Sequence, residues 1–413
     1  MTTLRKFGNS PVVEITLIFV IAAVTYLPNL SRATIYRDDW YYAMDRMIGG
    51  PGVFQEMFRI DRPARGPLFE IYYRLFDIQP LPYHMSSFFW RVLGGLAVLW
   101  LFRQLWPHQR LATFMMALFF TLYPGYQRWM EGFENQPRII SSFLEVLSIA
   151  LTLLAIRTTR RIFKIIAWTS SILLGWAYIA LVDFSFGMEA FRFLCVFLLI
   201  NRGQETRSFG HKTISAIRAW GIAVVIPAGY LFWRLFIFHN ERQATDIGLQ
   251  LSQLVASPFV TGAWWLMRLF QSVVNVAILA WGAPFFQNFF EISLPNILIG
   301  ILLAGIAVVL LWVSFSILKM EDNATDLYAG SRRSWQSEAV WVGLLGVVAG
   351  VLPVIVANRY VSFGAYSHYA LPASLTGVMV VVGVIFLINS PNRRIKQTSD
   401  KWRSSHSDPE RNF

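Results

Sequence analysis

The stretch YALPASLTGVMVVVGVIFLI, from Tyr369 to Ile388, contains no Asp, Glu, Lys or Arg. An apolar segment of about 20 residues forms a helix long enough to cross the hydrocarbon core of a bilayer. The whole chain has 413 residues, of which 55% are hydrophobic and only 15% are charged. Soluble domains carry about 25% charged residues. The composition therefore argues against water-soluble enzymes and nucleic-acid-binding modules, and predicts an all-α polytopic membrane protein.

Nine further segments have the same apolar character, which gives about ten predicted transmembrane helices in total. Both chain termini then lie on the same side of the membrane. The nine segments are Val12 to Leu27, Met85 to Trp106, Leu111 to Tyr126, Ile139 to Ile156, Ile162 to Val182, Phe184 to Ile200, Ala219 to Phe238, Leu294 to Leu318 and Val340 to Val356.

The lysines indicate which side of the membrane the termini occupy. All six fall in or beside the N-terminus, the even-numbered connections or the C-terminal tail, namely Lys6, Lys164, Lys212, Lys319, Lys396 and Lys401. Cytoplasmic segments carry the excess of Lys and Arg, so both termini are expected to be cytoplasmic. The net charge of +12 is therefore attributed to basic residues in cytoplasmic segments and not to nucleic-acid binding. The single cysteine, Cys195, lies in an apolar run, so no disulfide framework or cysteine metal cluster is expected.

Two segments of the sequence differ from the predicted transmembrane spans. Gly262 to Ala283 is apolar but contains Arg268, and a crossing there would break the lysine pattern. We expect an interfacial or re-entrant element within residues 245–290, with Trp264 and Trp265 at the level of the lipid headgroups. The tail, residues 390–413, is polar and basic without periodicity, and is expected to be a disordered cytoplasmic extension.

The connection between the first two spans, residues 30–83, is the longest outer segment and is called the first loop. It holds seven arginines, seven acidic residues and no lysine, with tyrosines and phenylalanines between them. This pattern indicates an ordered substructure at the membrane surface. Helical spacing predicts a helix from Asp38 to Met47, ended by Gly49-Gly50-Pro51-Gly52. A second, interfacial helix is predicted from Pro67 to Ile78, with Leu68, Ile71, Tyr72 and Leu75 toward the membrane.

Asp38 and Asp39 are the first candidate catalytic residues. A helix N-terminus favours one aspartate for structural reasons alone. Two adjacent aspartates with Arg37 beside them supply a base for a hydroxyl nucleophile and a cation for a phosphate leaving group. A small helix rotation exchanges the two carboxylates, so the sequence does not distinguish which is the base.

Further charged residues follow in three connections. Arg62 and Arg65, beside Asp61, match phosphate geometry, although a salt bridge that orders the loop is an equal alternative. The second loop, residues 127–138, and the late loop, residues 357–368, supply clusters that could converge with the first loop or form ion pairs of their own: Arg128, Glu131, Glu134, Arg138, Arg359, Tyr360 and His368. Asp183, Glu189 and Arg192 form a further group, within which a buried structural pair is expected, and His84 is given no role.

These features together resemble the GT-C superfamily of membrane glycosyltransferases. The resemblance rests on Arg37-Asp38-Asp39-Trp40 at the end of the first span, Asp61-Arg62-Pro63, the interfacial helix, the acidic second loop, Asn358-Arg359-Tyr360 and Tyr369-Ala370-Leu371-Pro372. Protein O-mannosyltransferases and lipid A aminoarabinose transferases are among the similar families. The likeness covers residues 1–240, expected to form a catalytic transmembrane module, and is loose for the C-terminal transmembrane region, residues 241–389.

The resemblance implies an active site at the outer leaflet of a bacterial plasma membrane and a polyprenyl-phosphate sugar donor. Asp38 would be the general base, Asp39 its alternate or partner, and Glu131 or Glu134 a helper. Arg37, Asp61, Arg62, Arg65, Arg138, Arg359 and His368 would hold substrate and phosphate. No metal site or required cofactor is expected, although a divalent cation remains possible between the aspartates. The acceptor, a hydroxyl of a lipid, glycan or protein, stays open, since no large soluble C-terminal domain is present to recognise it.

Three other functions fit parts of the pattern. A transporter or flippase of a lipid-linked saccharide would also need outward arginines, but usually shows internal repeats and polar residues at the bilayer midplane. A polymerase or ligase of lipid-linked glycans would place its key residues in later loops. A non-catalytic lipid-binding relative would tolerate loss of both aspartates.

Overall fold

The computed structural model describes residues 11–203, 208–241, 247–288, 292–325, 335–364 and 366–389. Every secondary-structure element within these ranges is a helix. The predicted disordered tail and three of the lysines, Lys6, Lys396 and Lys401, lie outside the described residues.

Within the described ranges, seven helices are long and apolar enough to cross a membrane. The chain is therefore a multi-pass helical membrane protein. The seven are α6 (Pro80–Leu105), α8 (Gln136–Arg157), α9 (Arg161–Leu181), α11 with η4 (Phe209–Ile237), the apolar part of α15 (Leu294–Trp312), α16 (Trp335–Val356) and η7 with α17 (Ser367–Ile388). Each coincides with one of the predicted spans.

The remaining three predicted spans form shorter helices. α2 (Pro11–Tyr26) and α10 (Met188–Gly203) each have 16 residues, and α7 (Arg110–Thr121) has 12. At a rise of about 1.5 Å per residue they extend about 24 Å and 18 Å, against a hydrocarbon core of about 30 Å. α7 stops early because Pro124 and Gly125 follow it closely. The count of ten spans stays a prediction.

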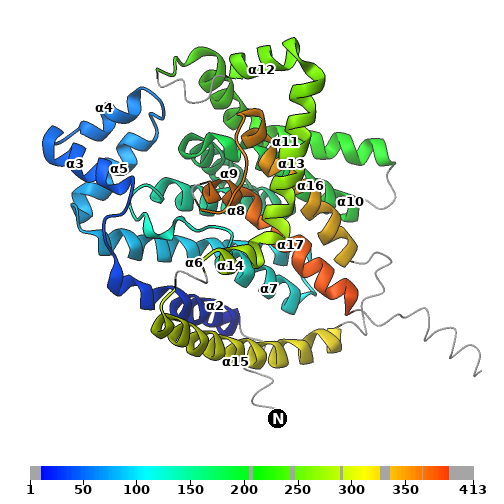
Figure 1. Cartoon of the computed structure of the whole chain (residues 1–413). Coiled ribbons are helices and arrows are strands. Elements are labelled where there is room, and N and C mark those ends of the chain that lie inside the picture. Colours follow the sequence, from blue (N-terminus) through cyan, green and yellow to red (C-terminus); the bar gives the residue numbers. More distant parts are fainter. Residues whose placement is uncertain are drawn as a thin grey trace, which may run out of the picture.

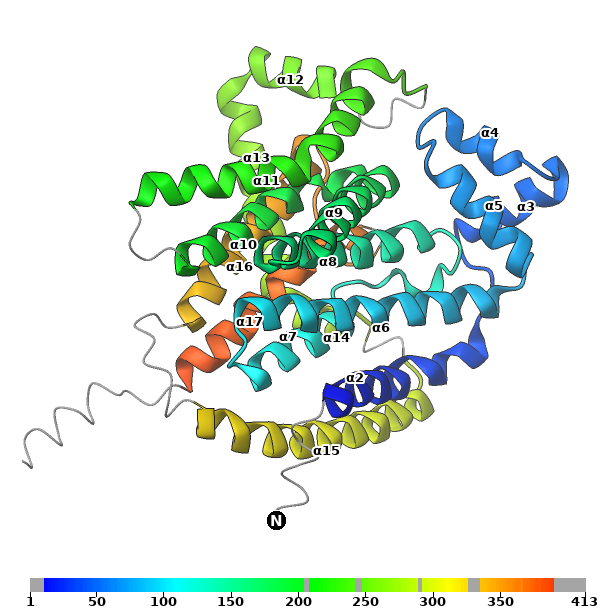
Figure 2. The ribbon, with the colours of Figure 1, turned by 180° about the vertical axis from the view of Figure 1, so that it is seen from behind.

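Most of the helices form one bundle, and two segments, α15 and the region around α13, pack at its edges (Figures 1 and 2). α15 (Leu294–Thr325) lies beside α2 on one side of the bundle. α13 (Pro258–Ala277) runs crosswise to α6 and α15 and packs on α16 and α17. It follows α12 (Ile247–Ala256) and leads through η5 (Leu279–Trp281) to α14 (Ala283–Asn288). The interfacial or re-entrant nature of this region stays a prediction, and residues 242–246 and 289–291 lie outside the description.

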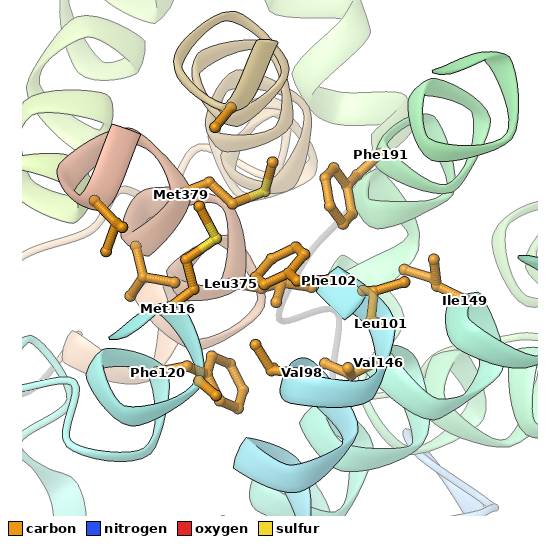
Figure 3. Packing of buried hydrophobic residues seen from close by; sticks show 14 of the residues in the cluster. Val98, Leu101, Phe102, Met116, Phe120, Val146, Ile149, Phe191, Leu375 and Met379 are labelled. Atoms are coloured by element: carbon orange, nitrogen blue, oxygen red, sulfur yellow. The ribbon is translucent and has the colours of Figure 1, made fainter. Parts of the chain in front are cut away.

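The bundle interior is a single large apolar cluster (Figure 3). It joins α6, α7, α8, α10 and α17, and its members include Val98, Leu101, Phe102, Met116, Phe120, Val146, Ile149, Phe191, Leu375 and Met379, all buried. This core fixes the positions of the helix ends from which the polar loops emerge.

α16 and α17 approach each other through small residues. Gly343, Gly346 and Gly350 follow one another at helical spacing on α16 and face α17. A Cβ atom added at Gly346 would lie 2.4 Å from Cγ2 of Thr376 and 3.1 Å from the ring of Phe191. Small residues at such an interface let two membrane helices pack closely.

We expect Gly346→Leu to lower the free energy of unfolding by about 1–3 kcal/mol, because overpacking displaces α17 from α16. Gly221→Leu on α11 is the matched control, since an added Cβ there meets nothing within 4 Å. Thermal unfolding in detergent micelles measures both variants. Equal stabilities of the two would contradict this packing.

Candidate functional site

Three helices of the first loop gather at one end of the bundle (Figures 1 and 2). They are α3 (Asp39–Gly49), α4 (Val53–Arg59) and α5 (Arg65–Phe76). α3 and α5 confirm the two predicted helices to within two residues at each end, whereas α4 was not predicted. Gly50 and Gly52, with φ of 66° and 86°, form the turn from α3 to α4, which confirms the predicted break.

Asp39 joins the first loop to the second. Its side chain is buried, and Oδ1 accepts hydrogen bonds from the backbone N–H groups of Phe133 (3.1 Å) and Glu134 (2.9 Å). Burial raises the pKa of Asp39 to about 7, against the lowering effect of these bonds, and the charges of Glu131 and Glu134 add to the increase. Asp39 is therefore a buried connection between the loops rather than a surface group.

Asp38, by contrast, has a half-exposed side chain, and it occupies the N-cap position of the same helix without a side-chain capping bond. Its Oδ2 accepts a hydrogen bond of 2.9 Å from Arg128. Arg128 also pairs with Glu131, and its Nη1 lies 3.4 Å from Nδ1 of His368. These four residues, the Asp38 cluster, come from the first, second and late loops. Both alternatives left open by the sequence therefore occur, because three loops meet here and Arg128 and Glu131 also form an ion pair within the second loop.

Glu134 is the centre of a second, buried cluster. It accepts a hydrogen bond from the hydroxyl of Tyr42 and pairs with Arg138, which also donates to Oδ1 of Asn135 at 3.0 Å. Burial alone would raise the pKa of Glu134, but the charges of Arg138 and Arg65 outweigh it and hold the pKa at about 2. We call Tyr42, Glu134, Asn135 and Arg138 the Glu134 cluster.

Tyr42 and Asn135 were not selected from the sequence as site residues. Tyr42 stacks on Phe69 of α5, with ring centroids 4.9 Å apart. The amide of Asn135 donates to the carbonyls of Arg128 and Glu131 and so shapes the second loop. The spacing of Tyr42 from Asp38 was visible as a shared helix face, but nothing in the sequence pairs it with Glu134.

The two arginines proposed to bind phosphate differ in exposure. Arg65 is buried, and its Nε donates to the carbonyl of Leu181 at 2.9 Å, so it braces α5 against the end of α9. Burial lowers the pKa of Arg65 to about 10. The Arg62 side chain is 37% exposed and lies 4.0 Å from Oδ2 of buried Asp61. Arg62 is the one of the two that can reach a ligand.

Two further predicted site residues, Arg37 and Arg359, also lie outside both clusters. Arg359 lines a separate cleft of about 210 Å³ with Trp264, Trp265, Arg268 and Tyr360. Arg37 is exposed and has a left-handed backbone, with φ of 49°. A non-glycine residue held in this conformation costs about 1–3 kcal/mol, and such residues concentrate at functional sites.

One other sequence interpretation is confirmed and one needs correction. Glu189 and Arg192 form the expected buried structural pair, at 2.9 Å, whereas Asp183 stands apart from it and lies 3.9 Å from Arg234. On α5, Ile71 and Leu75 are exposed as expected of a membrane-facing surface, but Tyr72 points inward.

Tyr72 turns inward because its hydroxyl has polar partners on α6. It lies 2.7 Å from the hydroxyl of Ser86 and accepts a hydrogen bond of 2.7 Å from Trp90. The predicted i,i+4 pair of Glu70 and Arg74 forms at 3.4 Å.

The shifted carboxyl groups predict how stability depends on pH. Asp39, with its raised pKa, binds more protons in the folded state than in the unfolded state between about pH 4 and 7. The contribution of Asp39 to the free energy of unfolding is therefore present at low pH. It is lost as the pH rises through this window, and the loss is about 4 kcal/mol at most. Asp39→Asn keeps the acceptor oxygen without the charge, so its stability relative to the native protein should increase from pH 4 to 7. Unfolding free energies in micelles across this range measure the difference, and a difference independent of pH would contradict the assignment.

Among the described residues, no group of three or more His, Cys, Asp or Glu side chains is arranged to hold a metal ion. No protein-family model matches the chain, and no curated protein sequence matches it either. The Asp38 and Glu134 clusters are therefore the features of the molecule that indicate its function.

Proposed function

We propose that this protein is a GT-C-like membrane glycosyltransferase with ten transmembrane spans. It transfers a sugar from a polyprenyl-phosphate donor to an acceptor hydroxyl at the outer face of the plasma membrane. The observation that supports this proposal is the half-exposed carboxylate of Asp38 beside Arg128 and His368, at one end of a membrane bundle.

In this proposal the carboxylate of Asp38 takes the proton of the acceptor hydroxyl. The hydroxyl oxygen forms a bond to the anomeric carbon while the bond from that carbon to the phosphate oxygen breaks. The lipid phosphate leaves as an anion and needs no proton, so one carboxylate suffices. A half-exposed side chain meets substrate, whereas buried Asp39 acts by holding the second loop in place.

Cations near Asp38 would stabilise the leaving phosphate. Arg128 is fixed by Glu131 and lies beside Asp38. Arg62, with a side chain that is 37% exposed, is a second candidate cation. Preorganised charges of this kind lower the barrier, because they need not reorient as the phosphate charge develops. Glu131 is thus a positioning residue for Arg128.

A transporter of lipid-linked saccharide is the second candidate, and one observation favours it. The sequence placed the charged residues mainly at the outer surface, but Glu145, Glu189 and Arg192 are fully buried among the helices. Ionisable residues within a membrane bundle often mark transport pathways.

One experiment distinguishes the glycosyltransferase from the transporter. The purified protein in lipid vesicles is given a panel of polyprenyl-phosphate sugars with soluble and lipid hydroxyl acceptors, and free polyprenyl phosphate is measured. The glycosyltransferase proposal predicts release with at least one donor. Movement of the donor between leaflets without any release would support the transporter instead.

A further inference from the structure

A continuous line of buried polar residues runs along α8 from the candidate site into the bundle. Arg138, Ser142, Glu145, Ser148 and Thr152 recur every three or four residues, so they share one face of the helix. All five are buried. We call this line the α8 track.

The inner residues of the α8 track, Ser148 and Thr152, are hydrogen-bonded to Arg192 of α10. The guanidinium donates to Ser148 (2.7 Å), Thr152 (3.1 Å) and Ser171 of α9 (3.1 Å), and pairs with Glu189 at 2.9 Å. The positive charge of Arg192 is therefore already balanced by the carboxylate of Glu189.

Glu145 has no comparable partner for its carboxyl group among the described residues. Its side chain is 1% exposed, and neither carboxyl oxygen has a hydrogen-bond partner among the described residues. An ionised Glu145 would be a charge removed from water and close to the like charge of Glu189, and the nearby cation of Arg192 is already paired with Glu189. A buried carboxyl group avoids that cost by binding a proton.

No other element packed on α8 offers Glu145 a cation. α9 presents Tyr178, whose hydroxyl donates to Glu189 at 2.6 Å, and the described part of α17 contains no ionisable residue. The ionisable residues of α6 contact other groups: Tyr83 the carbonyl of Asp77, His84 the backbone of Thr34 and Trp129, Arg91 the carbonyl of Thr121 and Arg103 the carboxylate of Glu14.

We propose that Glu145 is a proton-binding site within the membrane bundle, and that the α8 track connects it to the candidate site. Ser142, one turn from Glu145, borders a packing gap that it shares with Arg138, Ser185 and His368 and that is too narrow for a water molecule. The hydroxyl of Ser142 has no partner among the described residues, and it lies between Glu145 and Arg138 along the α8 track. This inference does not depend on the proposed glycosyl transfer.

Infrared absorption of the protein in lipid vesicles tests the proposal. The spectrum is recorded well above the pKa of Asp39, so that Asp39 is ionised. The native protein should show the carbonyl band of a protonated carboxylic acid. Glu145→Gln should remove this band, and Glu56→Gln, at an exposed residue of α4, should leave it unchanged.

An absent acid band in the native protein, or a band that survives in Glu145→Gln, would overturn the proposal. The glutamine side chain has the shape of a neutral glutamic acid, so Glu145→Gln should also unfold at the native temperature. A variant that fails to fold would equally contradict a protonated Glu145, whereas the glycosyl transfer proposal would be untouched by either result.

Discussion

Asp38→Asn is expected to lower the rate of polyprenyl-phosphate release by about 10²–10⁴-fold, the usual contribution of a positioned general base. The asparagine amide keeps the shape of the side chain but cannot accept the hydroxyl proton. Because the Asp38 side chain is half exposed, the variant should fold with native stability. The rate is measured in vesicles under saturating donor.

The matched control is Asp45→Asn, on the same helix and outside both clusters. It removes the same charge from α3 and should leave the rate within about twofold. If the two variants were equally active, Asp38 would not be the base. If they were equally inactive, the loss would come from the charge of α3 rather than from proton transfer.

Glu134→Gln is expected to lower the free energy of unfolding by about 3–5 kcal/mol, the usual cost of breaking a buried ion pair. Arg138 would lose its carboxylate partner while remaining buried, and buried Arg65 would lose a neighbouring negative charge. Chemical unfolding of the micelle-bound protein measures the change.

The same experiment on Glu56→Gln provides the control, because Glu56 is an exposed acid of the neighbouring helix α4. Its stability should stay within about 0.5 kcal/mol of native, as for most surface substitutions. A comparable small loss in Glu134→Gln would show that the Glu134 cluster contributes little to holding the loops together.

Sequence reasoning succeeded where a single periodicity decides the structure. A run such as Tyr369 to Ile388 has one favourable conformation in a membrane, and α17 forms there. The helices α3 and α5 were also predicted, because glycines and prolines mark their ends. The short helices α2, α7 and α10 show the limit, since an apolar run fixes neither where a helix ends nor whether it crosses the bilayer.

The charged residues of the two clusters were selected from the sequence, but Tyr42, Asn135 and the pairings were not. Asp38 and Arg128 are 90 residues apart, and their contact depends on how the whole bundle brings the loops together. The different surroundings of Asp38 and Asp39 could not be derived for the same reason, because burial of Asp39 requires the second loop. Glu145 was overlooked although an acid inside an apolar run was itself a signal.

The most direct test uses sealed vesicles in which the first loop faces outward and the donor occupies only the outer leaflet. Free polyprenyl phosphate and transferred sugar are counted together over time. Our account predicts that they appear one for one while the donor stays in the outer leaflet. Absence of release, or release only when the donor is supplied in the inner leaflet, would contradict glycosyl transfer at the outer face.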